Sequence, residues 1–255
     1  MDNTQLGSVT FQIKEQVAYI AFEHPAHNSL PSLLLAKLQQ TITQLGENNE
    51  VTLIVLQSAG DRTFCAGASF DELASIQDFH TGKKFFLGFA NVINAIRKCP
   101  KIVIGRVQGK SIGGGVGLSA ACDYCLATKA AAVKLSELVI GIGPFVIGPA
   151  VQRKMRLSAF SQLAINANEF QTAEWARDKG LYQEVFDSIE QLDAYIATFT
   201  NTLKQSNPDA LRLLKKVFWE GTENWDALLD ERAGMSGMLV LSDFTKNAIA
   251  DFKKN

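Results

Sequence analysis

A run of glycines between Gly105 and Ala121, in the segment "GRVQGKSIGGGVGLSAA", has the composition of a loop that binds negative charge. Its Gly-Lys-Ser resembles a phosphate-binding P-loop. That loop needs four residues between its first glycine and Gly-Lys-Ser, whereas three separate Gly105 from Gly109. Because a shorter loop presents fewer backbone amides to a phosphate, the spacing argues against a nucleoside triphosphate site.

The same glycines fit the dinucleotide fingerprint G-x-G-x-x-G only in part. Gly113, Gly115 and Gly117 spell G-x-G-x-G, and Leu118 stands where the last glycine belongs. A helix that begins at such a cluster still presents unpaired amide N–H groups, and these can stabilise a developing oxyanion as well as a phosphate. We therefore interpret the cluster as one half of an oxyanion site.

A second loop of small residues, "FCAGASF" at Phe64–Phe70, follows the preceding buried strand in the equivalent place. Two such loops at the same end of adjacent strands would direct two N–H groups at one carbonyl oxygen. Neither loop contains a serine–histidine pair, since His24, His27 and His80 lie outside both. Two donors without a nucleophile indicate enolate chemistry, which requires a base.

Glu137, in "KLSELVIGIGP", is the candidate base. It lies between apolar residues, where desolvation would raise the pKa of its carboxyl toward neutrality. A surface glutamate at the start of a helix is the alternative that the sequence leaves open.

Hydrophobic periodicity predicts the elements that position these loops. It predicts strands at Val9–Ile13, Val17–Phe22, Val51–Gly60 and Lys101–Val107, and helices at Pro31–Gly46 and Lys83–Lys98. Strand, glycine-rich loop and helix recur at a spacing of about fifty residues. This order predicts an α/β core over residues 1–188, which carries the site, and a helical C-terminal part over residues 189–255.

The composition of the chain limits the kinds of binding partner and the cellular compartment that we expect. The chain of 255 residues has a formal net charge of −1, which gives no long-range attraction to nucleic acid or to an anionic membrane. Its polar start is unlike a signal peptide and no apolar run would span a bilayer, so a cytoplasmic protein is expected. The four cysteines, Cys65, Cys99, Cys122 and Cys125, are expected to be buried thiols rather than metal ligands.

The motifs together resemble the crotonase (enoyl-CoA hydratase/isomerase) superfamily. "FCAGASFDEL" resembles its first oxyanion loop, "VQGKSIGGGVGLSAACD" its second, "LSELVIGIGP" its catalytic-acid segment and "HPAHNSL" its coenzyme A-binding loop. The resemblance implies a crotonase-type spiral of ββα units and an acyl-CoA substrate. It implies no cofactor besides the coenzyme A of the thioester, and no metal. It also implies a homotrimer or a dimer of trimers. The helical C-terminal part would take part in oligomerisation and would form a lid.

The resemblance assigns the functional roles of the family's residues to the matching positions of this sequence. The resemblance implies that the N–H groups of Ala66 and Gly114 form the oxyanion hole and that Glu137 is the catalytic acid–base. The implied substrate-binding residues are Ser29, Ala66, Ala68, Phe70, Gly114, Gly117 and Phe145.

Departures from the family pattern bear on the reaction. Two-acid hydratases carry an earlier glutamate at the position of Gly117, which has no side chain. An aspartate often found after the first loop is Ser69 here, and Phe145 and Val146 replace a glycine-rich segment near the acyl pocket.

Three functions are compatible with a single catalytic acid. The favoured one is reversible hydration of an enoyl-CoA of the 3-methylglutaconyl-CoA type, because polyketide dehydratases of 3-hydroxy-3-methylglutaryl thioesters have the same glycine. The alternatives are an enoyl-CoA isomerase and a non-catalytic acyl-CoA binder. Several helpers are candidates: His80 and Tyr124 for water, Arg153 and Lys84 for a distal carboxylate, and Arg62 and Lys253 for the coenzyme A phosphates.

Overall fold

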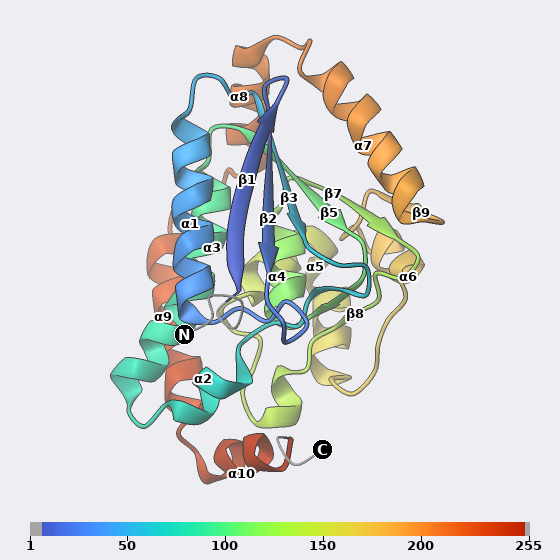
Figure 1. The fold of residues 1–255 in the computed structure, drawn as a ribbon. Helices are drawn as coiled ribbons and strands as arrows, with labels where there is room; N and C mark the ends of the chain where they lie inside the picture. Colours follow the sequence, from blue (N-terminus) through green and yellow to red (C-terminus); the bar gives the residue numbers. More distant parts are fainter. Residues whose placement is uncertain (1–6, 253–255) are drawn as a thin grey trace.

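A twisted sheet of six strands forms the centre of the computed structural model, which describes residues 7–252 (Figure 1). The spatial order is β1 (Ser8–Lys14), β2 (Val17–Glu23), β3 (Leu53–Ser58), β5 (Ile102–Val107), β7 (Tyr124–Thr128) and β9 (Glu184–Phe186). The predicted hairpin is confirmed, since β1 and β2 pair antiparallel, with Val9 opposite Phe22. All other neighbours in this sheet are parallel.

Both faces of the sheet are covered, which explains why its central strands are almost wholly apolar. On one face, Ile20, Ile54 and Val103 pack beneath α1 (Ser32–Glu47) and α3 (Phe79–Lys98). On the other, Val55 and Ile104 pack against α7 (Ile189–Leu203) and α8 (Pro208–Phe218). The alternation of inward side chains along each strand assigns its residues to these two layers.

A second, smaller sheet has three short parallel strands, β4 (Thr63–Cys65), β6 (Lys110–Ile112) and β8 (Val133–Lys134). Each follows a long strand of the main sheet and precedes a helical segment. The predicted ββα repeat is therefore confirmed. The helical segments are α2 (Phe70–Ser75), α4 (Gly114–Ala121) and the 3₁₀-helix η2 (Glu137–Ile140).

The remaining helices are α5 (Gly148–Ile165), α6 (Ala173–Asp178), α9 (Trp225–Leu239) and α10 (Asp243–Phe252). Helix α9 packs closely along α3, because Gly82 and Gly237 have no side chains to separate the backbones: a Cβ added at Gly237 would lie 2.5 Å from the backbone N of Lys83. Helix α10 packs near α2 and η2. The C-terminal helices thus touch the core, and their roles as lid and oligomerisation surface stay predictions.

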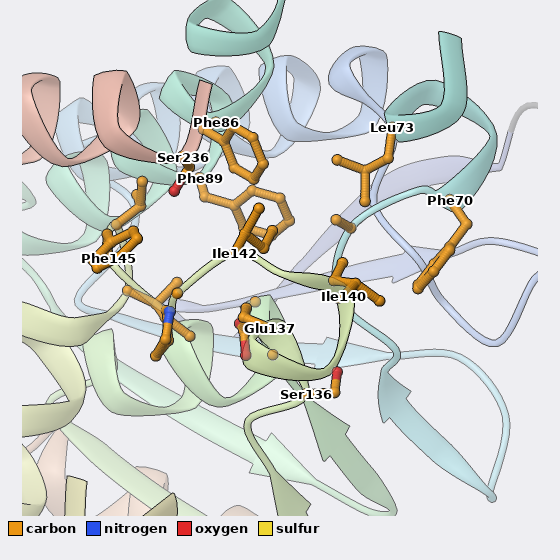
Figure 2. A pocket seen from close by; sticks show the side chains of 18 of the residues that line it. Phe70, Leu73, Phe86, Phe89, Ser136, Glu137, Ile140, Ile142, Phe145 and Ser236 are labelled. Atoms are coloured by element: carbon orange, nitrogen blue, oxygen red, sulfur yellow. The ribbon is translucent and has the colours of Figure 1, made fainter. Parts of the chain in front are cut away.

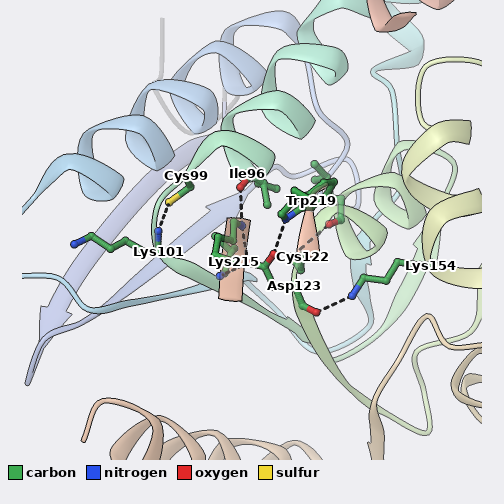
Figure 3. Close-up of polar contacts among 10 residues, drawn as sticks. Ile96, Cys99, Lys101, Cys122, Asp123, Lys154, Lys215 and Trp219 are labelled. Carbon is green, nitrogen blue, oxygen red and sulfur yellow. Dashed lines mark hydrogen bonds and ion pairs between the residues drawn. The ribbon is translucent and has the colours of Figure 1, made fainter. Parts of the chain in front are cut away.

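A buried ion pair holds α8 on the core (Figure 3). The Nζ of Lys215 lies 2.6 Å from Oδ2 of Asp123, and both side chains are almost fully buried. The Nε1 of Trp219 donates to Oδ1 of the same aspartate at 2.7 Å, and Lys215 also donates to the carbonyl of Ile96. The carboxylate at Asp123 therefore links α8 to the start of β7.

Three details of the described residues bear on the sequence expectations. Helix α3 begins at Phe79, four residues before the predicted start, because the side chain of Asp78 accepts a hydrogen bond from the N–H of Thr81 and caps the helix. All four cysteines are buried free thiols, as expected. No described helix combines the length and apolar character that crossing a membrane requires.

Candidate active site

Three loops meet at one edge of the small sheet. Parallel strands present their carboxyl ends at the same edge, so the residues that follow β4, β6 and β8 converge there. These residues are the first small-residue loop (Ala66–Ser69), the turn at Gly113 and Gly114, and the segment that leads to Glu137. The two predicted oxyanion loops and the predicted base are thus brought together.

Glycine is required where the first two loops touch. Gly67 has φ +86°, and a Cβ added there would lie 2.9 Å from the carbonyl oxygen of Ile112 and 3.2 Å from the N of Gly114. The segment before α1 supports this loop from behind. Asn28 donates from Nδ2 to the carbonyls of Ala59 and Thr63, and the N–H of Leu30 donates to the carbonyl of Gly67.

The backbone hydrogen bonds show which N–H groups of the two loops are free, and they correct the expectation for Ala66. The N–H of Ala66 donates to the carbonyl of His27 at 3.1 Å, so it is not available to a substrate oxygen. Two residues further on, the N–H of Ala68 has no acceptor among the described residues, and Ala68 lines the cavity. Gly114 begins α4, so its N–H has no intrahelical acceptor either. The geometry therefore replaces the pair Ala66 and Gly114 with Ala68 and Gly114.

Gly113 lies between the second loop and the acid. Its φ of +52° is a conformation that residues with side chains rarely adopt, and a Cβ there would lie 2.9 Å from Oε1 of Glu137. The absence of a side chain lets the glutamate carboxyl lie directly beside the start of α4, one residue before the free N–H of Gly114.

One oxygen of the Glu137 carboxyl is enclosed and has no partner among the described residues. Its Oε2 is buried and has no hydrogen-bond partner in the described part of the chain, although the residue as a whole is half-buried. Burial raises the pKa of Glu137 from 4.5 to about 7, opposed only by a hydrogen bond from its own backbone N–H. The group therefore exists in both protonation states near neutral pH, which suits a group that accepts and returns a proton.

A narrow cavity of about 60 Å³ lies in front of Glu137 (Figure 2). Its walls are almost entirely apolar, and their large side chains are Phe70, Leu73, Phe86, Phe89, Ile140, Ile142, Phe145, Val146 and Ile147. The polar side chains among the described lining residues are those of Ser136, Glu137 and Ser236. Glu137 projects into the middle of the cavity, with Phe145 and Ser236 toward one end and Phe70 and Leu73 toward the other. A thioester carbonyl at Ala68 and Gly114 would thus place its carbon chain among apolar side chains.

Ile147 fills the space beside Gly117, the position at which two-acid hydratases carry their earlier glutamate. A Cβ added at Gly117 would lie 2.4 Å from Cγ2 and 2.6 Å from Cβ of Ile147, a residue at the start of α5. Gly117 itself does not line the cavity, contrary to the sequence expectation, because Ile147 stands between it and the cavity space. Ile147 therefore contributes an apolar side chain to the cavity wall at this position.

Most other predicted binding residues lie where expected. Ala66, Ala68, Phe70, Gly114 and Phe145 line the cavity. Ser29 does not; it is buried behind the first loop, and its hydroxyl pairs with Nδ1 of His24 at 3.1 Å.

Of the suggested helper side chains that the structure describes, none lines the cavity. His80 is exposed on the first turn of α3, and Tyr124 stacks on Phe199 in the other layer. Lys84 is exposed, and the guanidinium of Arg153 lies over the ring of Trp219. Arg62 is exposed just before β4 and stays a candidate for coenzyme A, whereas Lys253 lies outside the described residues.

Ser236 and Ile147 are two of the site residues that the sequence did not indicate. Ser236 reaches the cavity from α9, about a hundred residues after the acid, and no local motif marks it. Ile147 reads as an ordinary apolar residue in the sequence. Only the packing of α5 against α4 gives it its place.

Comparison with known proteins identifies the fold and the family. An Arabidopsis thaliana protein, the peroxisomal Delta(3,5)-Delta(2,4)-dienoyl-CoA isomerase, is 27% identical over 92% of this chain and 88% of its own length. The mouse mitochondrial methylglutaconyl-CoA hydratase is 29% identical over 77% of this chain and 63% of its own. The crystal structure of enoyl-CoA hydratase from Bacillus halodurans has the same fold, with a TM-score of 0.88 at 21% identity over 95% of this chain and 99% of that one. The model of the enoyl-CoA hydratase/isomerase family matches residues 12–249, and the chain belongs to that family.

Proposed function

We propose that this chain is an enoyl-CoA isomerase, which shifts a carbon–carbon double bond along an acyl-CoA thioester by moving one proton. The observation that carries the proposal is that Glu137 is the sole titratable side chain among the described residues that line the cavity. A double-bond shift needs one group that takes a proton and gives it back. In the two-acid hydratases of the family, hydration uses a second carboxylate, and Gly117 stands at its position here.

The proposed reaction uses the geometry in two steps. The carboxylate of Glu137 takes a proton from Cα of a 3-enoyl thioester, and the electron pair moves onto the carbonyl oxygen as an enolate. The N–H groups of Ala68 and Gly114 hydrogen-bond that oxygen, and one such donor contributes about 2.7–4 kcal/mol to the transition state. The enolate collapses, Cγ takes the proton back from the carboxyl, and a 2-enoyl thioester results.

The pKa of Glu137 supports this cycle. At a value of about 7 the group is partly ionised at neutral pH, so it can act as the base in the first step and as the acid in the second. The apolar surroundings that raise the pKa also keep bulk water away from the enolate.

Hydration of a 3-methylglutaconyl-type substrate is the second candidate, favoured by the sequence and by the similarity to the mouse methylglutaconyl-CoA hydratase. Two features of the cavity weigh against it. Ile147 fills the place of the water-activating carboxylate, and no Lys, Arg or His is among the described lining residues to pair with the distal carboxylate of that substrate. An unpaired buried carboxylate is strongly disfavoured.

Product analysis separates the candidates. Purified protein is incubated with 3-hexenoyl-CoA, crotonyl-CoA or 3-methylglutaconyl-CoA, and the products are resolved by chromatography, with Glu137→Gln in parallel. We expect 2-hexenoyl-CoA from the first substrate with wild-type protein alone. Water addition to the branched substrate would support the hydratase instead. Retained thioester binding without any product would support a non-catalytic binder.

A further inference from the structure

A second cavity, of about 330 Å³, adjoins the first. The two cavities share Pro144 and Phe145 in their walls, so these residues form the partition between them. Helix α5 supplies much of the second wall, through apolar residues that include Leu157, Phe160 and Ala164. The cavity reaches the surface at Leu157, whose side chain is 62% exposed.

Phe145 is the aromatic part of this partition. Its ring lies against the backbone of Gly143: a Cβ added at Gly143 would lie 2.5 Å from Cζ of the ring. The glycine therefore permits the ring position seen here, and Phe145 is half-buried rather than locked in the core.

Arg232 on α9 lines the second cavity; its side chain is half-buried, and no ion pair holds it among the described residues. Its Nε is one of three buried side-chain nitrogen or oxygen atoms without a hydrogen bond among the described residues, the others being Oε2 of Glu137 and Oγ of Ser111. No described carboxylate forms an ion pair with it, and its recorded contact is a weak one, 4.0 Å from Nη1 to the sulfur of Met235. An enclosed guanidinium nitrogen without an acceptor is unfavourable unless a ligand supplies one.

Helix α9 connects the two cavities directly. Ser236 faces the first cavity and Arg232 the second, and the two are four residues apart on the same helix face. At 1.5 Å per residue they are separated by about 6 Å along the axis. A carbon chain that leaves the first cavity past Phe145 and Ser236 would therefore meet Arg232 after several further carbons.

We infer that the second cavity is a subsite for the far end of a medium-length acyl chain that terminates in a carboxylate, bound by Arg232. The inference rests on the proposed acyl-CoA function of the first cavity. Apolar walls suit the methylene chain, and a guanidinium suits a carboxylate because it donates two parallel hydrogen bonds. The site excludes a short dicarboxylate, whose charge would lie inside the apolar first cavity.

Binding of saturated thioesters tests this subsite separately from catalysis, because a saturated chain has no double bond to shift. The affinities of butanoyl-CoA, octanoyl-CoA and suberyl-CoA, which is octanoyl-CoA with a terminal carboxylate, are measured by calorimetry. We expect suberyl-CoA to bind about tenfold more tightly than octanoyl-CoA. Equal affinities would overturn the inference, whereas failure of the isomerase reaction would leave this comparison intact.

Three variants locate the effect. Arg232→Gln is expected to abolish the preference for suberyl-CoA, while the matched control Arg153→Gln, which changes an arginine outside the second cavity, keeps it. Ala164→Trp fills the second cavity and is expected to weaken octanoyl-CoA and suberyl-CoA while leaving butanoyl-CoA unchanged. A preference that persists in Arg232→Gln, or long chains unaffected by Ala164→Trp, would refute the assignment. The melting temperature of Arg232→Gln should not fall, because a buried donor without a partner is removed.

Discussion

Ile147 occupies the space that a side chain at position 117 would need: a Cβ built on Gly117 would lie 2.4 Å from Cγ2 of Ile147. The glycine in α4 and the isoleucine at the start of α5 are therefore complementary. The contact explains why Glu137 is the one described lining residue that presents a carboxyl to the cavity. A reaction with a single proton carrier follows from this pair of residues.

The complementarity predicts non-additive stability. Gly117→Glu alone should destabilise the fold by about 1–3 kcal/mol through overpacking, and Ile147→Ala alone by about 2–5 kcal/mol through the cavity that it leaves. The double variant should lose less than the sum of the two. Urea unfolding of all four proteins measures the coupling. Strict additivity would mean that the two side-chain positions do not compete for space.

The raised pKa of Glu137 predicts a pH-dependent stability difference. In the unfolded chain the group ionises near 4.5, and in the folded protein near 7, so the folded state is penalised as the pH rises between these values and stays penalised above them. The shift corresponds to about 3 kcal/mol. Glu137→Gln should therefore be more stable than wild type at pH 8 and close to it below pH 4.

Urea unfolding at several pH values checks this expectation. Glu50→Gln, a change at an exposed glutamate, is the matched control and should follow the wild-type curve. A constant difference between Glu137→Gln and wild type from pH 4 to pH 8 would show that the carboxyl ionises as freely when folded as when unfolded.

The contact between Gly67 and Gly114 predicts a loss of activity without a large loss of fold. Gly67→Ala would push a methyl group between the two loops, within 3.2 Å of the N of Gly114. We expect kcat/KM to fall about a hundredfold, the effect of losing one oxyanion donor. Gly221→Ala is the matched control, because Gly221 also has a positive φ, +79°, with no atom close to its Cβ position. If both variants lose activity equally, backbone strain rather than crowding is the cause.

The ion pair between Asp123 and Lys215 predicts a large effect on stability. Lys215→Met leaves a buried carboxylate without its cation and should cost about 3–5 kcal/mol. Arg212→Met, which breaks the exposed pair of Arg212 and Asp209, should cost less than about 1 kcal/mol. Thermal unfolding compares the two. Equal small losses would show that α8 docks through its apolar contacts rather than through Asp123.

The sequence predicted the fold and the raised pKa of Glu137 because both depend on local pattern. Apolar strands, glycine-rich turns and an isolated glutamate are visible without any tertiary information. The sequence assigned the first oxyanion donor to Ala66, two residues before Ala68, the donor that we propose. Only the tertiary hydrogen bond from the N–H of Ala66 to the carbonyl of His27 shows that this amide already has an acceptor. Ser236 and Arg232 reach the cavities from a helix far along the chain, and no spacing rule connects them to Glu137.

The fate of the transferred proton tests the central claim most directly. Wild-type protein is given 3-hexenoyl-CoA deuterated at C2, in ordinary water, and the 2-hexenoyl-CoA product is analysed for deuterium at C4 by NMR. Because the carboxyl of Glu137 is buried and acts alone, we expect part of the deuterium to be carried from C2 to C4, and Glu137→Gln to give no product. Turnover by Glu137→Gln at more than about a tenth of the wild-type rate would contradict the account.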